Sequence, residues 1–196
     1  MPEIIQLRVS LLESNPLIWR KILVSKDTTF FELHHIFQIV MGWENYHLFE
    51  FNVEGYRIGE IAEEEKDSGY GDDQLLNSRT VTLKDLITKK DTFKYSYDFG
   101  DNWQHLIKVE DFLEKDKNLK YPICIDGQMN CPPEDCGGID SFYDSLEILK
   151  DKKHPEHKET AQWFGKSYNL EIFNKEKANL QLKKLAKYIA NWNSSA

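Results

Sequence analysis

The 196-residue chain carries 33 Asp and Glu against 25 Lys and Arg, which gives a formal net charge of −8. A protein that binds nucleic acid over its whole surface needs an excess of Lys and Arg to neutralise phosphates, so this balance excludes that class and leaves only a local basic face. Hydrophobic residues make up 40% of the chain, enough to bury a core without disulfide or metal staples.

Apolar and polar side chains alternate along residues 4–12 and again along residues 18–24, which is the period of strands with one buried face. Asn15 and Pro16 lie between the two runs and are typical turn residues. The two runs therefore predict a hairpin. In its first arm, the side chains expected to face the core are Ile5, Leu7, Val9 and Leu11.

A helix is predicted after this hairpin. Thr29 and Glu32 have the spacing of a capping box, and Gly42 suits the end of a helix, where a positive φ is common. The apolar stripe between these ends consists of Leu33, Ile36, Phe37 and Val40. We interpret His34 and His35 as boundary residues, because neighbours on a helix do not share a face.

Residues 47–53 resume the strand pattern, so the predicted order is strand, strand, helix, strand. This order resembles the first half of a β-grasp layout, in which a helix crosses a mixed sheet. Residues 60–75 are rich in Asp and Glu and poor in apolar side chains, which predicts a solvated loop. A short helix is predicted over residues 82–87.

Residues 92–99 and 103–110 predict a second hairpin, because both runs are rich in aromatic and β-branched side chains and Gly100-Asp101 lies between them. Alternation places Phe93, Tyr95, Tyr97 and Phe99 on one face of the first arm. It places Trp103, His105, Ile107 and Val109 on one face of the second arm.

The C-terminal part is predicted to be helical. Residues 111–140 predict a loop, and helices are predicted over 141–150, 158–164 and 176–192. The buried stripe of the last helix is predicted to be Leu182, Leu185, Ala186 and Ile189. Three cationic residues lie off this stripe: Lys183, Lys184 and Lys187.

These elements predict a single α+β domain over residues 1–196, with a mixed or antiparallel sheet made of hairpins, one packed helix and a helical C-terminal part. The β-rich part covers residues 1–112, and the loop and helices cover residues 113–196. The chain opens with acidic residues and a strand pattern, and no apolar run is long enough to span a bilayer. We therefore expect no signal peptide, no membrane contact and a cytoplasmic protein with reduced thiols.

Three cysteines are candidate metal ligands. Cys124, Cys131 and Cys136 are not spaced as paired CxxC knuckles, but thiolates are good zinc ligands, and a structural zinc site needs four Cys or His. The candidates for the fourth ligand are His105, His154 and His157. The alternative is that the cysteines are small buried apolar residues beneath a loop.

The segment NCPPEDCGG, residues 130–138, has a well-specified shape. Pro132 and Pro133 restrict the backbone, while Gly137 and Gly138 free it where the segment ends. The adjacent acids Glu134 and Asp135 are candidates for holding a cation, for capping the helix that follows, or for plain exposure to solvent.

A second set of polar residues surrounds the turn of the aromatic hairpin: Asp98, Asp101, Trp103 and His105. Acids and a histidine near a turn can support metal-assisted hydrolysis. Alternation, however, directs His105 toward the core and Asp98 the other way, so the two side chains do not converge. A histidine with a buried hydrogen-bond partner is the favoured interpretation of His105.

Several stretches together resemble the plasmid pRiA4b ORF-3-like family: IWRKILV at 18–24 followed by TTFFELHHIFQIVMGWENYHLFEF at 28–51, YSYDFGDNWQHLIKVE at 95–110 and YPICIDGQMNCPPEDCGGIDSFYDSLEIL at 121–149. The family blocks fall on Asp98, Gly100, Asp101, Trp103, His105, Cys131, Pro132, Pro133, Glu134, Asp135, Cys136, Gly137 and Gly138. Members travel on plasmids and insertion elements, often under a resolvase-like label. The resemblance implies a mobile-element origin and no established reaction.

These observations lead us to expect a binding or accessory module with an unidentified protein partner. The expected functional surface lies where residues 98–103 meet residues 124–138, with Asp98, Asp101, Trp103, His105, Glu134 and Asp135 as binding residues. One alternative is a metal-dependent hydrolase or nuclease that binds zinc through Cys124, Cys131, Cys136 and His105, with Asp98 and Asp101. Another is a DNA-binding accessory protein that uses Lys183, Lys184 and Lys187, against which the acidic total weighs.

Overall fold

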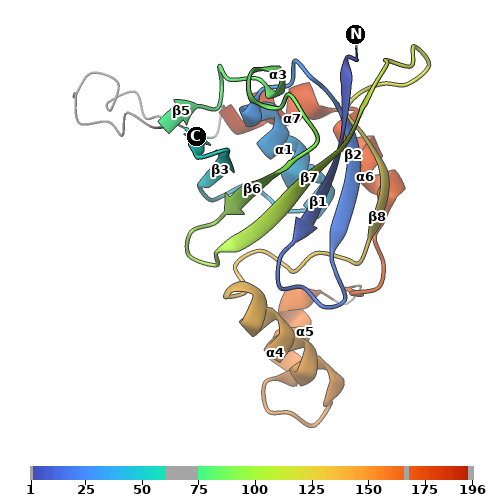
Figure 1. The fold of residues 1–196 in the computed structure, drawn as a ribbon. Helices are drawn as coiled ribbons and strands as arrows, with labels where there is room; N and C mark the ends of the chain where they lie inside the picture. The colour runs from blue at the N-terminus through green and yellow to red at the C-terminus, as the bar shows by residue number, and fades with distance from the viewer. Residues whose placement is uncertain (1, 61–74, 166–167, 194–196) are drawn as a thin grey trace.

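The computed structural model describes residues 2–60, 75–165 and 168–193 (Figure 1). The solvated loop that the sequence predicts over residues 60–75 lies, from residue 61 to residue 74, outside these residues. Within the described ranges, no helix has the length and apolar character that crossing a bilayer would require.

The described strands form one eight-stranded mixed sheet in the order β5-β4-β3-β6-β7-β1-β2-β8. Every pairing is antiparallel except that of β4 with β5. The strands are β1 Ile4–Leu11, β2 Trp19–Ser25, β3 Phe49–Val53, β4 Tyr56–Gly59, β5 Leu75–Asn77, β6 Thr92–Tyr97, β7 Trp103–Leu113 and β8 Ile123–Gln128.

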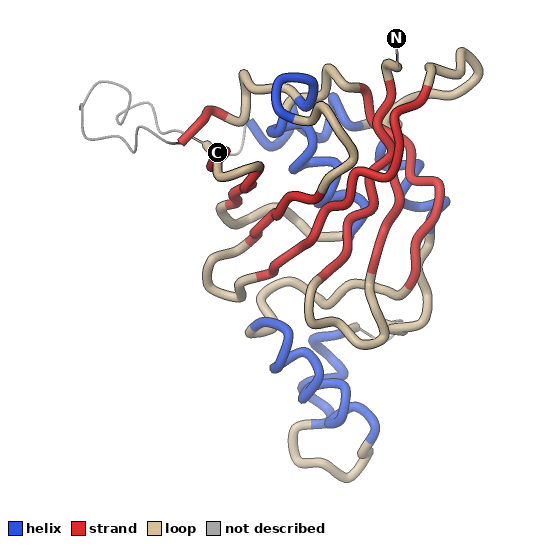
Figure 2. Tube along the Cα trace, in the orientation of Figure 1, coloured by secondary structure: helices blue, strands red, loops and turns tan. Residues whose placement is uncertain are grey.

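The helices lie mainly on one side of this sheet. They are α1 Phe30–Met41, α3 Leu83–Leu86, α4 Gly138–Lys150, α5 His157–Phe164, α6 Lys175–Leu182 and α7 Leu185–Asn193. Helices α1, α6 and α7 lie behind the sheet, whereas α4 and α5 project beyond its end (Figures 1 and 2). The predicted α+β class, with a mixed sheet and a helical C-terminal part, is confirmed.

The first four elements follow local sequence signals. Strands β1 and β2 pair as the predicted hairpin, and the expected core side chains of β1 are buried. In α1, the Thr29 hydroxyl accepts from the Glu32 amide and the Glu32 carboxylate accepts from the Thr29 amide, which forms the predicted capping box. Gly42 ends the helix at φ 91°. Burial of each large apolar side chain of α1 contributes about 1.5–3 kcal/mol.

The second hairpin is also confirmed, because β6 pairs antiparallel with β7 and Tyr95 lies opposite His105. The prediction for Phe99 is wrong: its side chain is 57% exposed. Strand β6 ends at Tyr97, and Asp98 adopts a φ of 55°, so the alternation stops before Phe99.

Three further predictions are corrected. The expected loop over residues 111–140 contains the end of β7 and the whole of β8, which extends the sheet beyond β2. The expected single helix over residues 176–192 is two helices, α6 and α7, because the chain turns at Lys183 and Lys184. Ala186 is exposed rather than part of a buried stripe.

His34 and His35 are fully buried, so their interpretation as boundary residues is wrong. The reason is that α1 is covered on two sides. His34 stacks on Phe49 of the sheet, with ring centroids 3.7 Å apart, while His35 contacts the rings of Tyr188 and Trp192 on α7. Two neighbours that point in different directions are therefore both in the core.

Candidate functional site

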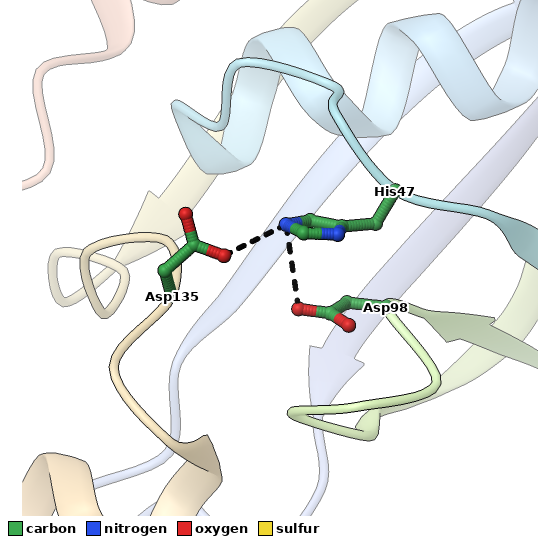
Figure 3. A group of neighbouring side chains, drawn as sticks. All are labelled: His47, Asp98 and Asp135. Atoms are coloured by element: carbon green, nitrogen blue, oxygen red, sulfur yellow. Dashed lines mark hydrogen bonds and ion pairs between the residues drawn. The ribbon is translucent and has the colours of Figure 1, made fainter.

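Three loops meet at one end of the sheet, and we call this place the junction. The first loop, residues 44–48, connects α1 to β3. The second loop, residues 98–102, is the turn between β6 and β7. The third loop, residues 131–137, leads from β8 into α4 and holds the two prolines. The three backbones approach one another in Figure 3.

The second and third loops touch through Asp101. Its Oδ2 accepts a hydrogen bond from the backbone N–H of Gly137 at 3.0 Å. Its carbonyl oxygen lies only 2.7 Å from the position that a Cβ of Gly138 would occupy. The expected contact between the hairpin turn and the proline-containing segment is therefore present.

Glu134 connects the third loop to the other two. One carboxylate oxygen accepts from the Glu44 amide at 2.5 Å, and the other accepts from the Tyr97 hydroxyl. Burial, followed by this carboxylate, raises the pKa of Tyr97 above its usual range, so the hydroxyl keeps its proton. Glu134 therefore does not cap α4, where the N-cap residue is Gly137.

His47 lies between two aspartates, one from each of the other loops (Figure 3). Its Nε2 is 2.8 Å from Asp135 Oδ1 and 3.6 Å from Asp98 Oδ2. Asp98 and Asp135 both have a positive φ, of 55° and 57°, and this conformation directs both carboxylates toward the imidazole. These three side chains could hold a cation, since their ligand atoms all lie within 4.8 Å of one another.

His47 is not among the site residues that the sequence predicts. The sequence predicts His47 as the first residue of a strand, but β3 begins at Phe49 and His47 lies in the loop before it. Its partners are 51 and 88 residues away. The only signal was the loop itself, in which Asn45 and His47 are polar residues between a buried helix and a buried strand. Loop residues with such placement are disproportionately functional.

Trp103 and His105 lie beneath the junction rather than on it, since both are buried by the predicted alternation. Desolvation lowers the pKa of His105 to about 4, so the ring is neutral. Its Nδ1 lies 3.3 Å from the carbonyl oxygen of Tyr95, which confirms a buried hydrogen-bond partner. Neither side chain reaches the surface of the junction, and their role as binding residues stays a prediction.

The three thiols are buried and free. Cys124 Sγ contacts the Asp126 carbonyl oxygen, and Cys136 Sγ contacts the Gly138 carbonyl oxygen. Cys131 Sγ contacts Met41 Sδ and accepts a hydrogen bond from Arg20 Nη2. Desolvation raises the pKa of Cys124 to about 11 and that of Cys136 to about 12, and it also raises that of Cys131.

The proposed zinc ligands are not brought together. Within the described ranges, only His47, Asp98 and Asp135 place three potential ligand atoms so close to one another, and neither the cysteines nor His105 belongs to such a group. The physical reason is that β8 fixes Cys124 on the sheet, while His105 is enclosed in the core. Zinc binding itself stays a prediction.

The junction has an unbalanced charge. In the part of the chain that the structure describes, none of its carboxylates forms an ion pair with Lys or Arg, and His47 is their only ion-pair partner. These carboxylates belong to Glu44, Asp98, Asp101, Glu134 and Asp135. The first two loops also expose three large apolar side chains, those of Tyr46, Leu48 and Phe99.

The fold and the junction together define an α+β protein with a carboxylate-rich loop site at one end of a mixed sheet. The chain belongs to the plasmid pRiA4b ORF-3-like protein family, whose model matches residues 3–177. The resemblance seen in the sequence motifs is thereby confirmed.

Two relatives cover most of the chain. Uncharacterized protein y4hQ of Sinorhizobium fredii (strain NBRC 101917 / NGR234) is 34% identical over 166 residues, which is 84% of this chain and 82% of the relative. The crystal structure of a protein of unknown function, MM3350 from Methanosarcina mazei Go1, is similar with a TM-score of 0.79 and 35% identity, covering 88% of this chain and 96% of that one.

Proposed function

We propose that the chain is a binding module, an accessory protein of mobile-element origin that works in the cytoplasm and contacts its partner through the junction. The observation that carries this proposal is the combination, at the junction, of five carboxylates that form no ion pair with a described Lys or Arg and of three exposed apolar side chains. Surfaces that pair charge with exposed aromatic or aliphatic side chains are typical of interaction sites.

The chemistry of the junction points to a partner that presents a basic and apolar segment. Negative potential at the junction attracts Lys and Arg and raises the rate of encounter. Tyr46, Leu48 and Phe99 offer the apolar area that a docked segment would bury. A protein segment with alternating basic and apolar side chains fits this description.

The environments of the nucleophilic side chains support binding rather than covalent catalysis. All three cysteines are buried, and desolvation raises the pKa of their thiols, so the reactive thiolate is disfavoured. His35 and His105 have pKa values lowered to about 4 and are also buried. These groups are poorly suited to nucleophilic or general-base roles at the surface.

The two alternatives from the sequence have less support. The hydrolase or nuclease alternative drew its metal ligands from the three cysteines and His105, with Asp98 and Asp101. Among the described residues, Asp98 alone of these belongs to a close group of three potential ligands. The DNA-binding alternative uses Lys183, Lys184 and Lys187, which are exposed at and after the turn between α6 and α7. Binding of a DNA duplex that weakens steeply with salt, and that is lost when all three are changed to Gln, would favour that alternative instead.

Fluorescence anisotropy tests the proposed function with a labelled peptide of Lys and Leu and, as a control, a peptide of Glu and Leu. The double variant Asp101→Asn/Glu134→Gln keeps the shape of both side chains and removes two charges. We expect it to weaken binding of the basic peptide about tenfold. The control variant Glu159→Gln/Glu171→Gln removes two exposed charges elsewhere and should bind as the wild type does. Equal affinities for both double variants would reject the junction as the binding surface.

A further inference from the structure

We propose that His47, Asp98 and Asp135 bind a divalent transition-metal cation. The inference concerns the same junction as the proposed function and names an inorganic ligand for it. It rests on the contacts of these three side chains, and it does not require that a protein partner bind there.

The spacing of the three donors suits a metal ion. His47 Nε2 lies 2.8 Å from Asp135 Oδ1 and 3.6 Å from Asp98 Oδ2. A cation about 2.1 Å from each donor requires donor separations of about 3.0 Å at right angles or about 3.4 Å in a tetrahedral arrangement. The two separations from His47 lie on both sides of these values, and all three donor atoms lie within 4.8 Å of one another.

Asp98 provides an independent reason to expect a ligand. Its side chain is only 8% exposed, and its Oδ1 accepts from the Gly100 amide at 2.9 Å. Its Oδ2 accepts no hydrogen bond from any described residue, and the 3.6 Å approach of His47 is too long to be one. The long ion pair with His47 is therefore the contact that Asp98 Oδ2 makes, and a bound cation would compensate the charge of this largely buried side chain more closely.

The surroundings leave room for the ion and attract it. The side chains of His47 and Asp135 are 31% and 63% exposed, so solvent can reach the three donors and supply the remaining ligands. Within the described ranges no Lys or Arg forms an ion pair with either aspartate, so no fixed cation competes for them. The negative potential of Glu44, Asp101 and Glu134 adds a further attraction.

The donor set selects the class of cation. One imidazole nitrogen with two carboxylate oxygens suits Zn²⁺ or Mn²⁺ better than Mg²⁺ or Ca²⁺, which prefer all-oxygen sites. Because the three ligands come from three separate loops, an ion bound to all of them would clamp the junction. Binding should therefore stabilise the folded chain by mass action.

The experiment uses the full chain after treatment with EDTA and dialysis. ZnCl2 is titrated by isothermal calorimetry, and thermal unfolding is followed with and without Zn²⁺. We expect one Zn²⁺ per chain in the wild type and a higher Tm in its presence. Asp98→Asn keeps the bond to Gly100, and asparagine tolerates a positive φ, so this variant should fold but bind Zn²⁺ at least about tenfold more weakly.

Two further variants separate the possible sites. His47→Gln should lose Zn²⁺ affinity as Asp98→Asn does, whereas Cys131→Ser should bind as the wild type does. No Zn²⁺ binding by the wild type, or equal affinity in His47→Gln and the wild type, would overturn the inference. Strong thiolate-to-metal charge-transfer absorption after loading with Co²⁺ would assign the ion to cysteine and would also overturn it.

The outcomes for the ion and for the proposed function are distinguishable. Binding of the Lys and Leu peptide is measured on the same protein in EDTA. If the peptide binds but Zn²⁺ does not, this inference alone fails. If Zn²⁺ binds at His47 and the peptide does not bind, the inference stands and the proposed function fails.

Discussion

The carbonyl oxygen of Asp101 lies directly over Gly138, 2.7 Å from the point where a Cβ would stand. Gly138 also has a φ of 82°, in the left-handed region that favours glycine. The second and third loops of the junction can approach this closely only because residue 138 has no side chain. The contact between Asp101 and Gly138 therefore shows that these two loops pack closely against each other.

Gly138→Ala should destabilise the fold more than the left-handed backbone alone requires. The strain of a positive φ costs about 1–2 kcal/mol, and the clash with a backbone atom adds to it. Gly55→Ala is the matched control, because Gly55 has a φ of 93° and nothing within 4 Å of its Cβ position. Urea unfolding compares the two free energies of unfolding. Equal losses in the two variants would show that the second and third loops are not in close contact.

Arg20 should be a large contributor to stability. Its guanidinium is fully buried and donates to the carbonyl oxygens of Val40, Trp19 and Gln128 at 2.8–2.9 Å. It also stacks on Phe173, 3.8 Å from the ring centroid, and no described carboxylate pairs with it. Removal of this side chain leaves three carbonyls without that donor, in one buried and two partly buried hydrogen bonds.

We therefore expect Arg20→Met to reduce the free energy of unfolding by about 3–5 kcal/mol. Arg20→Lys should also be costly, because an ammonium group cannot reproduce the fork of donors. Arg8→Met is the control: Arg8 stacks on Trp19 at 4.3 Å but is only half-buried. A loss in Arg20→Met no larger than that in Arg8→Met would contradict this account.

Stability should fall as the pH is lowered from about 6.5 toward 4. Desolvation lowers the pKa of His35 and His105 to about 4, and it lowers that of His34 as well. In the unfolded chain a histidine has a pKa of about 6.5, so over this window the unfolded state binds more protons than the folded state. Each such histidine removes up to about 1.4 kcal/mol of stability per pH unit.

Urea unfolding at several pH values measures this slope, and NMR of the imidazole protons follows each ring in the folded chain. His35→Gln should reduce the slope by close to one proton. Titration of His35 or His105 near pH 6.5 in the folded chain would show that the rings are not desolvated as described.

The thiols should be unreactive in the folded chain. Cys124, Cys131 and Cys136 are buried, and desolvation raises the pKa of each. A thiol reagent such as DTNB should therefore react slowly with the native protein and with all three cysteines in urea. Rapid reaction of any cysteine in the native state would contradict this burial.

Much of the fold was predictable because its signals are local. Each signal lies within a few residues of the chain: the capping box of α1, the glycine at its C-terminal end and the alternation in both hairpins. Strand β8 was not predicted because it is the last strand of the sheet, and only Cys124 in it is fully buried. The division between α6 and α7 was missed because the apolar stripe passes through the turn.

The candidate site was predictable only in part. The sequence predicts that the hairpin turn with Asp101 meets the proline-containing segment with Glu134. In the structure, both side chains form hydrogen bonds from one loop to another. Nothing local indicated His47, since its role depends on partners from two other loops. His105 and the three cysteines were predicted as zinc ligands because imidazole and thiolate groups bind zinc. Their directions and their burial depend on tertiary packing, which the local sequence does not show.

Because the chain is synthesised from its N-terminus, the junction can be completed only after most of the chain has been made. Its hydrogen bonds join residue 44 to residue 134 and residue 101 to residue 137, so no early fragment contains a complete set. A chain emerging from the ribosome can form α1 and both hairpins while Asp98 and His47 still lack their third partner. Contacts between positions so distant in sequence are slow to close. Competence to bind should therefore arrive after the sheet, as a late event in the maturation of each new molecule.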